Sequence, residues 1–310
     1  MKITIMGGAG TVGSCTAFAL ASQGLADEMV MTDINQNLLK NHVMDINAAV
    51  VGQRDIIIRT GSDEDIAGSD VVIISAGVHF WTGASRREVL DVNIPIIRDA
   101  AKKIARFCPD AVVITATNPV DPLNYAVYLN SELDRKKIIG YNLNDSIRFR
   151  MVIARALGIS PTRVEGVATG EHARATVLLF SSIRVDGQIH PVDEDFKRRI
   201  RKEMPTLLRS LADLGAGRSA GWTCAIGLAI TVRAIGENTR QMIPCSAVLA
   251  GEYGYEGLSM GVPAIMDREG IREIVEWDLP ADERKELEDV ASELKTSADI
   301  VREATGPNPR

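Results

Sequence analysis

Three glycines near the amino terminus have the spacing of a phosphate-binding turn. They belong to Gly8-Ala9-Gly10-Thr11-Val12-Gly13, which follows an apolar run and opens a helix-type pattern. The first glycine would make the tight turn, the second would let a pyrophosphate approach the main chain, and the third would let the helix pack on the sheet. N–H groups at the helix start, including those of Thr11 and Val12, would then hold the anion. Alone, the motif is a weak signal that depends on its context.

A carboxylate at the end of the second apolar run supplies that context. Asp33 follows Gly13 by twenty residues, and an acidic residue at this distance typically hydrogen-bonds the adenosine ribose. Its charge would repel a 2′-phosphate, so the sequence predicts that NAD binds in preference to NADP. The alternative is a tight strand-to-helix turn that binds nothing.

Other residue types suit proton transfer and anion binding. Histidine has a pKa near 7 and is the usual acid/base at neutral pH, and the chain has only four histidines: His42, His79, His172 and His190. A substrate carboxylate needs a planar, bidentate cation. Arg148 lies three residues after Asp145, so the two share one helical face.

Short β-branched runs alternate with longer helical patterns through the first half of the chain. Strand candidates are residues 2–6, 28–32, 55–59, 71–75, 111–116 and 137–139, and helical periodicity covers, for example, 11–23 and 92–107. Most strand candidates are apolar at nearly every position, as expected when both faces are covered. This alternation predicts an α/β fold with a Rossmann-type doubly wound parallel sheet.

After about residue 145 the pattern predicts a mixed α+β lobe. Helices are expected at 146–157, 193–214, 223–236 and 281–302, and extended segments at 163–168, 176–185 and 246–262. No repeat or low-complexity linker separates the halves. We therefore expect a dinucleotide-binding domain over residues 1–143 and a substrate and catalytic domain over 144–310.

Composition and charge argue against several classes of function. The formal net charge is −6, whereas a general nucleic-acid binder needs a basic surface. The four cysteines have neither C-x-x-C nor zinc-ligand spacing, so no metal site is expected. No apolar run approaches the ~18 residues that span a bilayer, and the amino terminus starts directly with a strand pattern. We expect a cytoplasmic protein without nucleic-acid or membrane partners.

Six short motifs in a fixed order resemble the lactate/malate dehydrogenase family over nearly the whole chain. They lie at residues 72–77 (VIISAG), 117–121 (TNPVD), 144–149 (NDSIRF), 170–172 (GEH), 251–254 (GEYG) and 261–263 (GVP). The resemblance implies an NAD-dependent oxidoreductase that transfers a hydride between NAD(H) and a small 2-hydroxy or 2-oxo carboxylic acid. The C-terminal half is most similar to archaeal-type malate dehydrogenases.

The same resemblance implies roles for the catalytic residues. His172 takes the position of the acid/base, and Asp145 that of the carboxylate that orients its ring. Arg148 is implied as the clamp on the substrate carboxylate. Arg86 is implied as the loop arginine that polarises the substrate carbonyl, with its neighbour Arg87 as the alternative.

Further positions are implied on the cofactor side. Asn118 matches an asparagine close to both the nicotinamide and the substrate hydroxyl, with a cis bond to Pro119. Ala76 and Gly77 fall beside the cofactor, and Asn93 near the closed loop. A core-facing asparagine at position 93 would look the same in sequence.

Departures from the family bear on the substrate. Where malate enzymes carry an arginine and lactate enzymes a glutamine, this chain has Phe80, which cannot pair with a carboxylate. The other pocket wall falls at Trp222 or Thr223. These residues suggest a substrate with an apolar or aromatic side chain. The alternative is a malate dehydrogenase whose distal carboxylate is bound by another arginine, Arg87 or Arg174.

Two further departures lie close to the catalytic residues. The usual G-E-H-G-D is replaced by Gly170-Glu171-His172-Ala173-Arg174. If Arg174 is close, it should lower the pKa of the imidazole; alternatively, it could bind a second anionic group on the substrate. The segment 140–144 is one residue shorter than usual, which leaves its loop details open but not the assignment of Asp145.

Two other functions compete with a 2-hydroxy-acid dehydrogenase. An NAD-requiring glycosidase on a related fold needs cysteine and histidine metal ligands near the Asn118 turn, and here Ala116 and Thr117 precede it. A non-catalytic NAD sensor would not need the set of His172, Asp145 and Arg148. The resemblance to the dehydrogenase family implies a homodimer or homotetramer.

Overall fold

The amino-terminal half forms a parallel sheet from the apolar runs of the sequence. The computed structural model describes residues 1–78, 85–215 and 220–306. Its first six strands are β1 (Lys2–Met6), β2 (Glu28–Thr32), β3 (Ile57–Thr60), β4 (Val71–Ile74), β5 (Val112–Thr115) and β6 (Ile138–Gly140). They pair in parallel in the order β3-β2-β1-β4-β5-β6. The chain therefore reverses its direction across the sheet between β1 and β4, which is where open α/β sheets bind their ligands.

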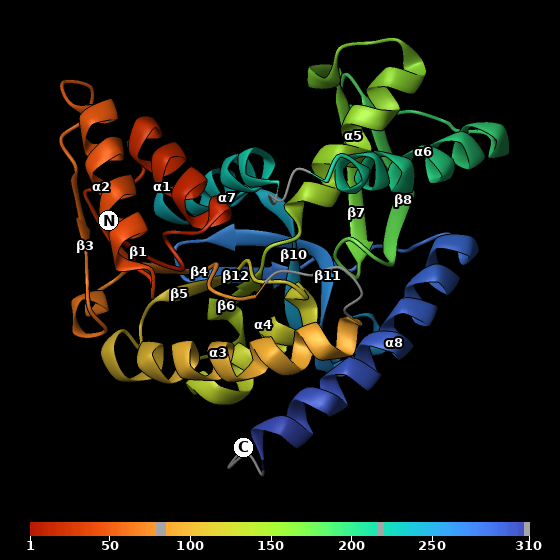
Figure 1. Cartoon of the computed structure of the whole chain (residues 1–310). Helices are drawn as coiled ribbons and strands as arrows, with labels where there is room; N and C mark the ends of the chain where they lie inside the picture. The colour runs from red at the N-terminus through yellow and green to blue at the C-terminus, as the bar shows by residue number, and fades with distance from the viewer. Residues whose placement is uncertain (79–84, 216–219, 307–310) are drawn as a thin grey trace.

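Helices cover both faces of this sheet (Figure 1). On one side lie α1 (Thr11–Gln23) and α2 (Gln36–Val50), and on the other α3 (Arg86–Phe107) and α4 (Val120–Ser131). The predicted doubly wound α/β fold is thus confirmed. The helix expected from residue 92 in fact begins at Arg86, because Ser85 and Glu88 form a reciprocal capping box that fixes the start of α3. The periodic apolar positions had indicated only its later turns.

The second half extends the same sheet with antiparallel strands. It contains α5 (Leu143–Leu157), β7 (Val164–Gly170), β8 (Thr176–Val185), β9 (Gln188–Ile189), α6 (Glu194–Asp213), α7 (Gly221–Gly236), β10 (Met242–Ala250), β11 (Glu256–Asp267), β12 (Gly270–Ile274) and α8 (Ala281–Thr305). Short 3-10 turns occupy Glu64–Ile66 (η1), Arg135–Lys137 (η2), Pro161–Arg163 (η3) and Glu252–Gly254 (η4). β10 pairs with β6, and β11 with β7, so both halves share one sheet.

Two of the differences from the sequence expectation affect the arrangement of this half. The single extended segment expected at 246–262 is a hairpin of β10 and β11, joined through the η4 turn. Helix α5 starts at Leu143 rather than residue 146, which places Asp145 in its first turn. The division into domains at residue 143 stays a prediction.

Most buried apolar side chains belong to one core between the sheet and its helices. A second, smaller cluster lies between α5, β7, β8 and α6. Phe149 and Phe180 meet there edge to face, with ring centroids 5.6 Å apart, an arrangement favoured for aromatic pairs. This smaller cluster packs against α5, the helix that supplies Asp145 and Arg148 to the site.

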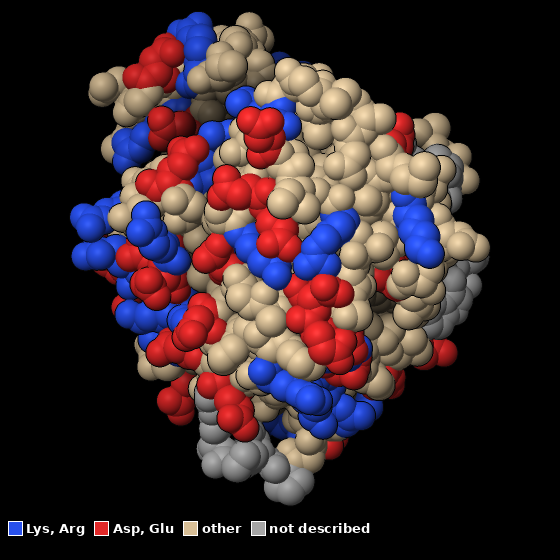
Figure 2. Space-filling model, turned by 90° about the vertical axis from the view of Figure 1, so that its left-hand side faces the viewer, with Lys and Arg blue, Asp and Glu red and all other residues tan. Residues whose placement is uncertain are grey.

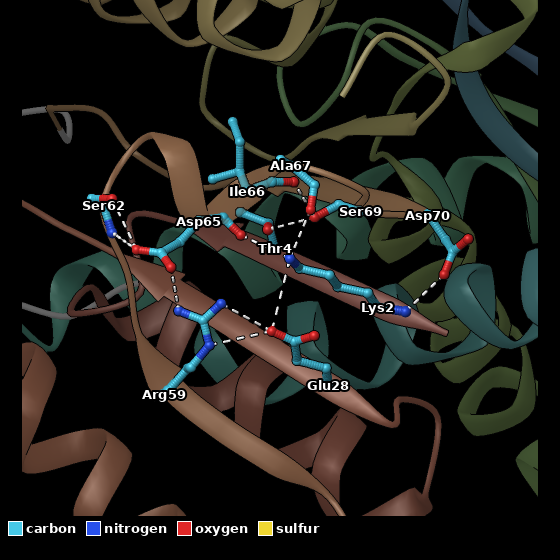
Figure 3. Close-up of polar contacts among 10 residues, drawn as sticks. All are labelled: Lys2, Thr4, Glu28, Arg59, Ser62, Asp65, Ile66, Ala67, Ser69 and Asp70. Carbon is cyan, nitrogen blue, oxygen red and sulfur yellow. Dashed lines mark hydrogen bonds and ion pairs between the residues drawn. The ribbon is translucent and has the colours of Figure 1, made fainter. Parts of the chain in front are cut away.

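A polar network ties the opening residues of β1 to β2, β3 and η1 (Figure 3). The ammonium of Lys2 donates to the carbonyls of Asp65 and Ala67 at 2.8 and 2.7 Å. The guanidinium of Arg59 binds Glu28 and Asp65. The N–H of Ser62 and then Arg59 hold the pKa of Asp65 at about 2. Because Lys2 begins β1 and the glycine turn follows its other end, this network braces the sheet away from that turn.

Charges of both signs are mixed on the face shown in Figure 2, with a broad uncharged area towards its upper right.

None of the helices in the described ranges is both long and apolar enough to cross a bilayer.

Candidate active site

The turn between β1 and α1 needs glycine at several positions. Gly7 has φ +89°, and a Cβ there would lie 2.4 Å from the main-chain nitrogen of Ala76. A Cβ on Gly13 would lie 2.3 Å from the carbonyl oxygen of Gly7. Gly8 lies within the tight turn, as expected, because the N–H of Gly10 closes that turn on the carbonyl of Gly7, but the left-handed conformation belongs to Gly7. Gly8 instead passes close to Met31 and Leu39.

The first turn of α1 presents free donors at the switch point of the sheet. Gly10 is its N-cap, and no side-chain hydrogen bond caps the helix. The N–H of Gly10 turns back to the carbonyl of Gly7, which leaves the N–H groups of Thr11, Val12 and Gly13 at the helix start. A helix end with such donors is suited to a phosphate group.

Asp33 is locked beside this turn. Its Oδ2 accepts the N–H of Ala9 at 3.0 Å, and its Oδ1 accepts the N–H of Asn35 at 2.9 Å. The side chain is half-buried, and a carboxylate has about four acceptor positions. Two of them remain for ribose hydroxyls, so the residues present fit an adenosine-containing dinucleotide.

The ends of β4 and β5 form the next part of the site. A Cβ on Gly77 would lie 2.4 Å from Cγ2 of Thr117, and the hydroxyl of Thr117 donates to the carbonyl of Ala76. The two loops therefore approach each other closely, and only glycine fits at position 77. The Asn118–Pro119 bond is cis, and the side chain of Asn118 is exposed where the two loops meet.

Asn93 is fully buried beneath these loops. Its Nδ2 donates to the carbonyls of Val78 and Asn118, both at 3.0 Å, and its Oδ1 accepts the N–H of Val78 at 2.7 Å. Both amide protons are thus committed to the main chain. The family resemblance places Asn93 among the cofactor contacts. Its hydrogen bonds are instead those of a residue that holds the loops in place.

His172 and Asp145 form a buried pair. Nδ1 of His172 lies 2.7 Å from Oδ2 of Asp145, and their side chains are only 8% and 5% exposed. A carboxylate only accepts, so the proton of the neutral ring is on Nδ1, and Nε2 is the free nitrogen. Burial by itself lowers the pKa of the imidazole, but the carboxylates of Asp145 and Asp121 together outweigh it, and the net pKa is above the ordinary value.

Arg148 lies one helical turn from Asp145 on α5 and is itself buried. Within the described part of the chain, its guanidinium makes one ion pair, a long contact of 3.5 Å to Oδ1 of Asp145. A buried guanidinium with most of its five donors unused is costly unless an anion completes its bonding. The geometry therefore suits bidentate binding of a carboxylate.

The two other arginines considered for a second anion are paired elsewhere. Arg174 binds Glu171 at 3.0 Å and also pairs with Glu293 on α8. The main influences on the pKa of His172 are burial, Asp145, Asp121 and Arg148. Nε of Arg87 binds both carboxylate oxygens of Asp91, each at 2.8 Å. Phe80 and the side chain of Arg86 lie outside the described residues; the main chain of Arg86 begins α3.

The candidates for the pocket wall are found at the start of α7. The side chain of Trp222 is 65% exposed, whereas the carbonyl of Thr223 lies 3.3 Å from the hydroxyl of Tyr141. That hydroxyl also donates to Asn144 at 2.6 Å. Burial raises the pKa of Tyr141 well above its ordinary range, so the phenol stays neutral. Thr223 is thereby tied to the neighbour of Asp145, and we propose that it, rather than Trp222, borders the substrate.

Sequence reasoning missed two residues of the site. Gly7 precedes the three-glycine motif, so the motif did not include it. Asp121 was quoted within a motif but received no role, although its Oδ2 accepts the main-chain N–H of His172 at 2.9 Å. The described residues hold no group of three or more His, Cys, Asp or Glu side chains suited to a metal ion.

Comparisons with known proteins agree over nearly the full chain. Residues 1–140 match the NAD binding domain of lactate/malate dehydrogenases, and residues 143–305 match their alpha/beta C-terminal domain. The chain is 37% identical to a malate dehydrogenase of Natronomonas pharaonis, over 97% of this chain and 99% of that protein. It is 32% identical to L-lactate dehydrogenase 2 of Lactococcus lactis, over 97% and 100%.

Solved structures show the same two kinds of relative. The malate dehydrogenase from Aeropyrum pernix superposes with a TM-score of 0.90 at 29% identity, covering 96% of this chain and 97% of that one. A ligand-bound minor L-lactate dehydrogenase from Enterococcus mundtii gives a TM-score of 0.91 at 30% identity, covering 97% and 98%.

Proposed function

Since the chain belongs to the lactate/malate dehydrogenase family, and is an NAD-dependent L-2-hydroxyacid dehydrogenase, we propose that its substrate carries no second carboxylate. The substrate would be a 2-oxo or 2-hydroxy acid with an apolar or aromatic side chain. One observation carries this choice: Arg87 and Arg174, the described arginines considered for a distal carboxylate, are each engaged by acidic partners. Phe80 occupies the sequence position expected to face that end of the substrate.

The cofactor would be held by the α1 turn and by Asp33. The pyrophosphate would accept from the N–H groups that begin α1, and the ribose hydroxyls would donate to Asp33. When bound, the nicotinamide supplies or accepts the hydride. The carboxylate of Asp33 repels a 2′-phosphate, so NAD is preferred over NADP.

The chain's own residues manage the proton and the substrate. Nδ1 of His172 is committed to Asp145, so Nε2 exchanges the proton with the substrate oxygen. Asp145 stabilises the imidazolium that forms when the alcohol is oxidised. Arg148 holds the 1-carboxylate and thereby orients the 2-carbon. We assign to Arg86 the polarisation of the carbonyl, and to Asn118 a contact with the substrate oxygen.

A malate dehydrogenase is the second candidate, because malate dehydrogenases are among the curated relatives at 34–37% identity. In that case Arg87 or Arg174 would have to leave its acidic partner and bind the distal carboxylate.

Substrate choice is tested with a panel of 2-oxo acids and NADH, followed by the loss of nicotinamide absorbance. Oxaloacetate, pyruvate, 2-oxoisocaproate, phenylpyruvate and sulfopyruvate cover the alternatives. We expect 2-oxoisocaproate or phenylpyruvate to give the highest kcat/KM. If oxaloacetate were the best substrate, the chain would be a malate dehydrogenase instead.

We also propose that the chain forms a homodimer or homotetramer. Large apolar side chains are exposed on neighbouring helices, namely Phe18 on α1, Met44 on α2, and Trp222 and Ile226 on α7. Helix α1 contacts both α2 and α7, and exposed apolar side chains gathered on adjacent elements mark interfaces. Light scattering should show an oligomer; a monomer at assay concentration would contradict this. The expected cytoplasmic location stays a prediction.

A further inference from the structure

Asp121 connects the cofactor half of the chain to the catalytic histidine. It lies in the first turn of α4, two residues after Pro119, and it is fully buried. Its Oδ2 accepts the main-chain N–H of His172 at 2.9 Å across 51 residues of sequence. A buried carboxylate is expensive unless it is hydrogen-bonded. The free energy of burying Asp121 therefore depends in part on its hydrogen bond to the main chain of His172.

Helix α4 is held firmly at this point. Asn124 lies three residues after Asp121, on the same helical face, and is also fully buried. Its Nδ2 donates to the carbonyl of Ser246 at 3.1 Å and to the hydroxyl of Ser259 at 2.9 Å. These bonds join α4 to β10 and β11, so Asp121 is presented to His172 from a fixed support.

The turn that carries His172 depends on such support. Ala173 has φ +69°, a left-handed conformation that is unfavourable for an L-residue with a side chain. The N–H of Ala173 lies 3.3 Å from Oδ2 of Asp145. Two successive N–H groups are thus held by two carboxylates, that of His172 by Asp121 and that of Ala173 by Asp145. Without Asp121, the N–H of His172 would lose this acceptor.

We propose that Asp121 is a positioning residue for the reaction: Asp145 fixes the ring of His172, while Asp121 fixes its main chain and adds a second buried negative charge beside it. This inference rests on the proposed acid/base role of His172. The first turn of α4 directly follows Pro119 on the cofactor side, and through Asp121 it also holds the main chain of His172. The cofactor-side turn and the proton-transfer group therefore form one rigid unit.

The charged groups around the imidazole are consistent with this role. Helix α5 contributes Asp145 and Arg148, and α4 contributes Asp121. Burial lowers the pKa of His172, Asp145 raises it most and Asp121 raises it further, while Arg148 opposes them. On the histidine's own segment, Glu171 and Arg174 pair with each other, and Arg174 reaches Glu293 on α8.

Asp121→Asn separates charge from hydrogen bonding. The amide oxygen can still accept the N–H of His172, but the negative charge is gone. We expect the pH profile of 2-oxo acid reduction to fall off at lower pH than in the wild type. NMR of histidine-labelled protein should show the His172 ring titrating at lower pH, with a His172→Gln spectrum for assignment among the four histidines. NADH affinity should stay within about twofold, a difference of ~0.4 kcal/mol.

Asp121→Ala removes both effects. A small displacement of a reacting group lowers the rate by up to a hundredfold, so we expect kcat to fall by about ten- to a hundredfold, and more than KM changes. The titration of His172 should shift in the same direction as in Asp121→Asn. Should the alanine variant fail to fold, the isosteric asparagine variant still tests the charge.

Glu283→Gln is the matched control. Glu283 is also a buried carboxylate in the first turn of a helix, α8, and it accepts the N–H of Ser181 at 2.8 Å. A merely structural role predicts the same behaviour for Glu283 and Asp121: lower stability with an unchanged pH profile. We expect that behaviour for Glu283→Gln alone.

The outcomes separate this inference from the proposed function. If His172→Ala abolishes turnover while both Asp121 variants keep the wild-type kcat, pH profile and His172 titration, the inference is wrong and the function stands. If no 2-oxo acid is reduced by the wild type, the proposed function is wrong. The NMR titration then still decides the inference, and an unshifted His172 in Asp121→Asn refutes it.

Discussion

Nδ1 of His172 and Oδ2 of Asp145 lie 2.7 Å apart, although the residues are separated by 27 positions in the chain. One comes from the turn between β7 and β8, the other from the first turn of α5. Both side chains are almost wholly buried. The pair therefore has one defined tautomer and one free nitrogen, which is the arrangement that proton transfer to a bound substrate needs.

Removal of the histidine should abolish most of the turnover without loss of cofactor binding. His172→Ala is expected to lower kcat by a factor of about 10²–10⁴, the usual contribution of a general acid/base. NADH binding, followed by fluorescence, should be close to that of the wild type. His190→Ala, at the residue directly after β9, is the control and should keep full activity. Normal turnover by His172→Ala would place the proton donor elsewhere.

The pH dependence should follow the raised pKa of His172. Reduction of a 2-oxo acid requires the imidazolium. Because the pKa is raised, the imidazolium persists to higher pH than in free histidine, whose pKa is about 6.5. The rate should be full at low pH and decline as the pH passes the raised pKa, while alcohol oxidation shows the opposite limb. Asp145→Asn removes the main cause of the increase, so its profile should move to lower pH. A move to higher pH would refute this assignment.

Cofactor choice should depend on Asp33. A 2′-phosphate would approach a carboxylate that is held in place by the N–H groups of Ala9 and Asn35. We expect NADH to be preferred over NADPH by at least about tenfold in kcat/KM, which corresponds to ~1.4 kcal/mol. Asp33→Ser should narrow this ratio, while Asp65→Asn, in η1, should leave it unchanged. Equal efficiency of the wild type with both cofactors would rule out the ribose assignment.

Ala173 should be a site of stored backbone strain. Its φ of +69° is one that glycine adopts freely and alanine does not. Ala173→Gly is expected to raise the free energy of unfolding by about 0.5–1 kcal/mol, after the larger unfolded-state entropy of glycine is subtracted. Ala175→Gly, two residues later and outside the left-handed region, should give no gain. Urea unfolding measures both; a destabilised Ala173→Gly would show that the methyl group has packing that outweighs the strain.

The sheet and the reactive pair could be predicted from the sequence to different extents. Strands β4 and β5 are buried at every position, and continuous apolar runs of this kind can be recognised from the sequence alone. The pairing of His172 with Asp145 came from motif resemblance, because no local pattern links residues so far apart.

Other features depend on contacts that a sequence does not display. The start of α3 is set by the Ser85–Glu88 capping box rather than by apolar periodicity. The role of Asn93 could not be predicted for the same reason. A buried asparagine that holds two loops cannot be distinguished by sequence from an asparagine that contacts a cofactor. The partners of Arg174 lie in the same turn and on α8, and the second of these could be found only from the fold.

One comparison tests whether this 2-hydroxyacid dehydrogenase lacks a site for a distal carboxylate. We would measure kcat/KM for oxaloacetate and for 2-oxoisocaproate in the wild type and in Phe80→Arg. We expect 2-oxoisocaproate to be the better substrate of the wild type. We also expect Phe80→Arg to improve kcat/KM for oxaloacetate by about 1.5–3 kcal/mol through a charge-assisted hydrogen bond, roughly ten- to a hundredfold. Efficient wild-type reduction of oxaloacetate that Phe80→Arg does not change would contradict these expectations, and would assign the distal carboxylate to another arginine.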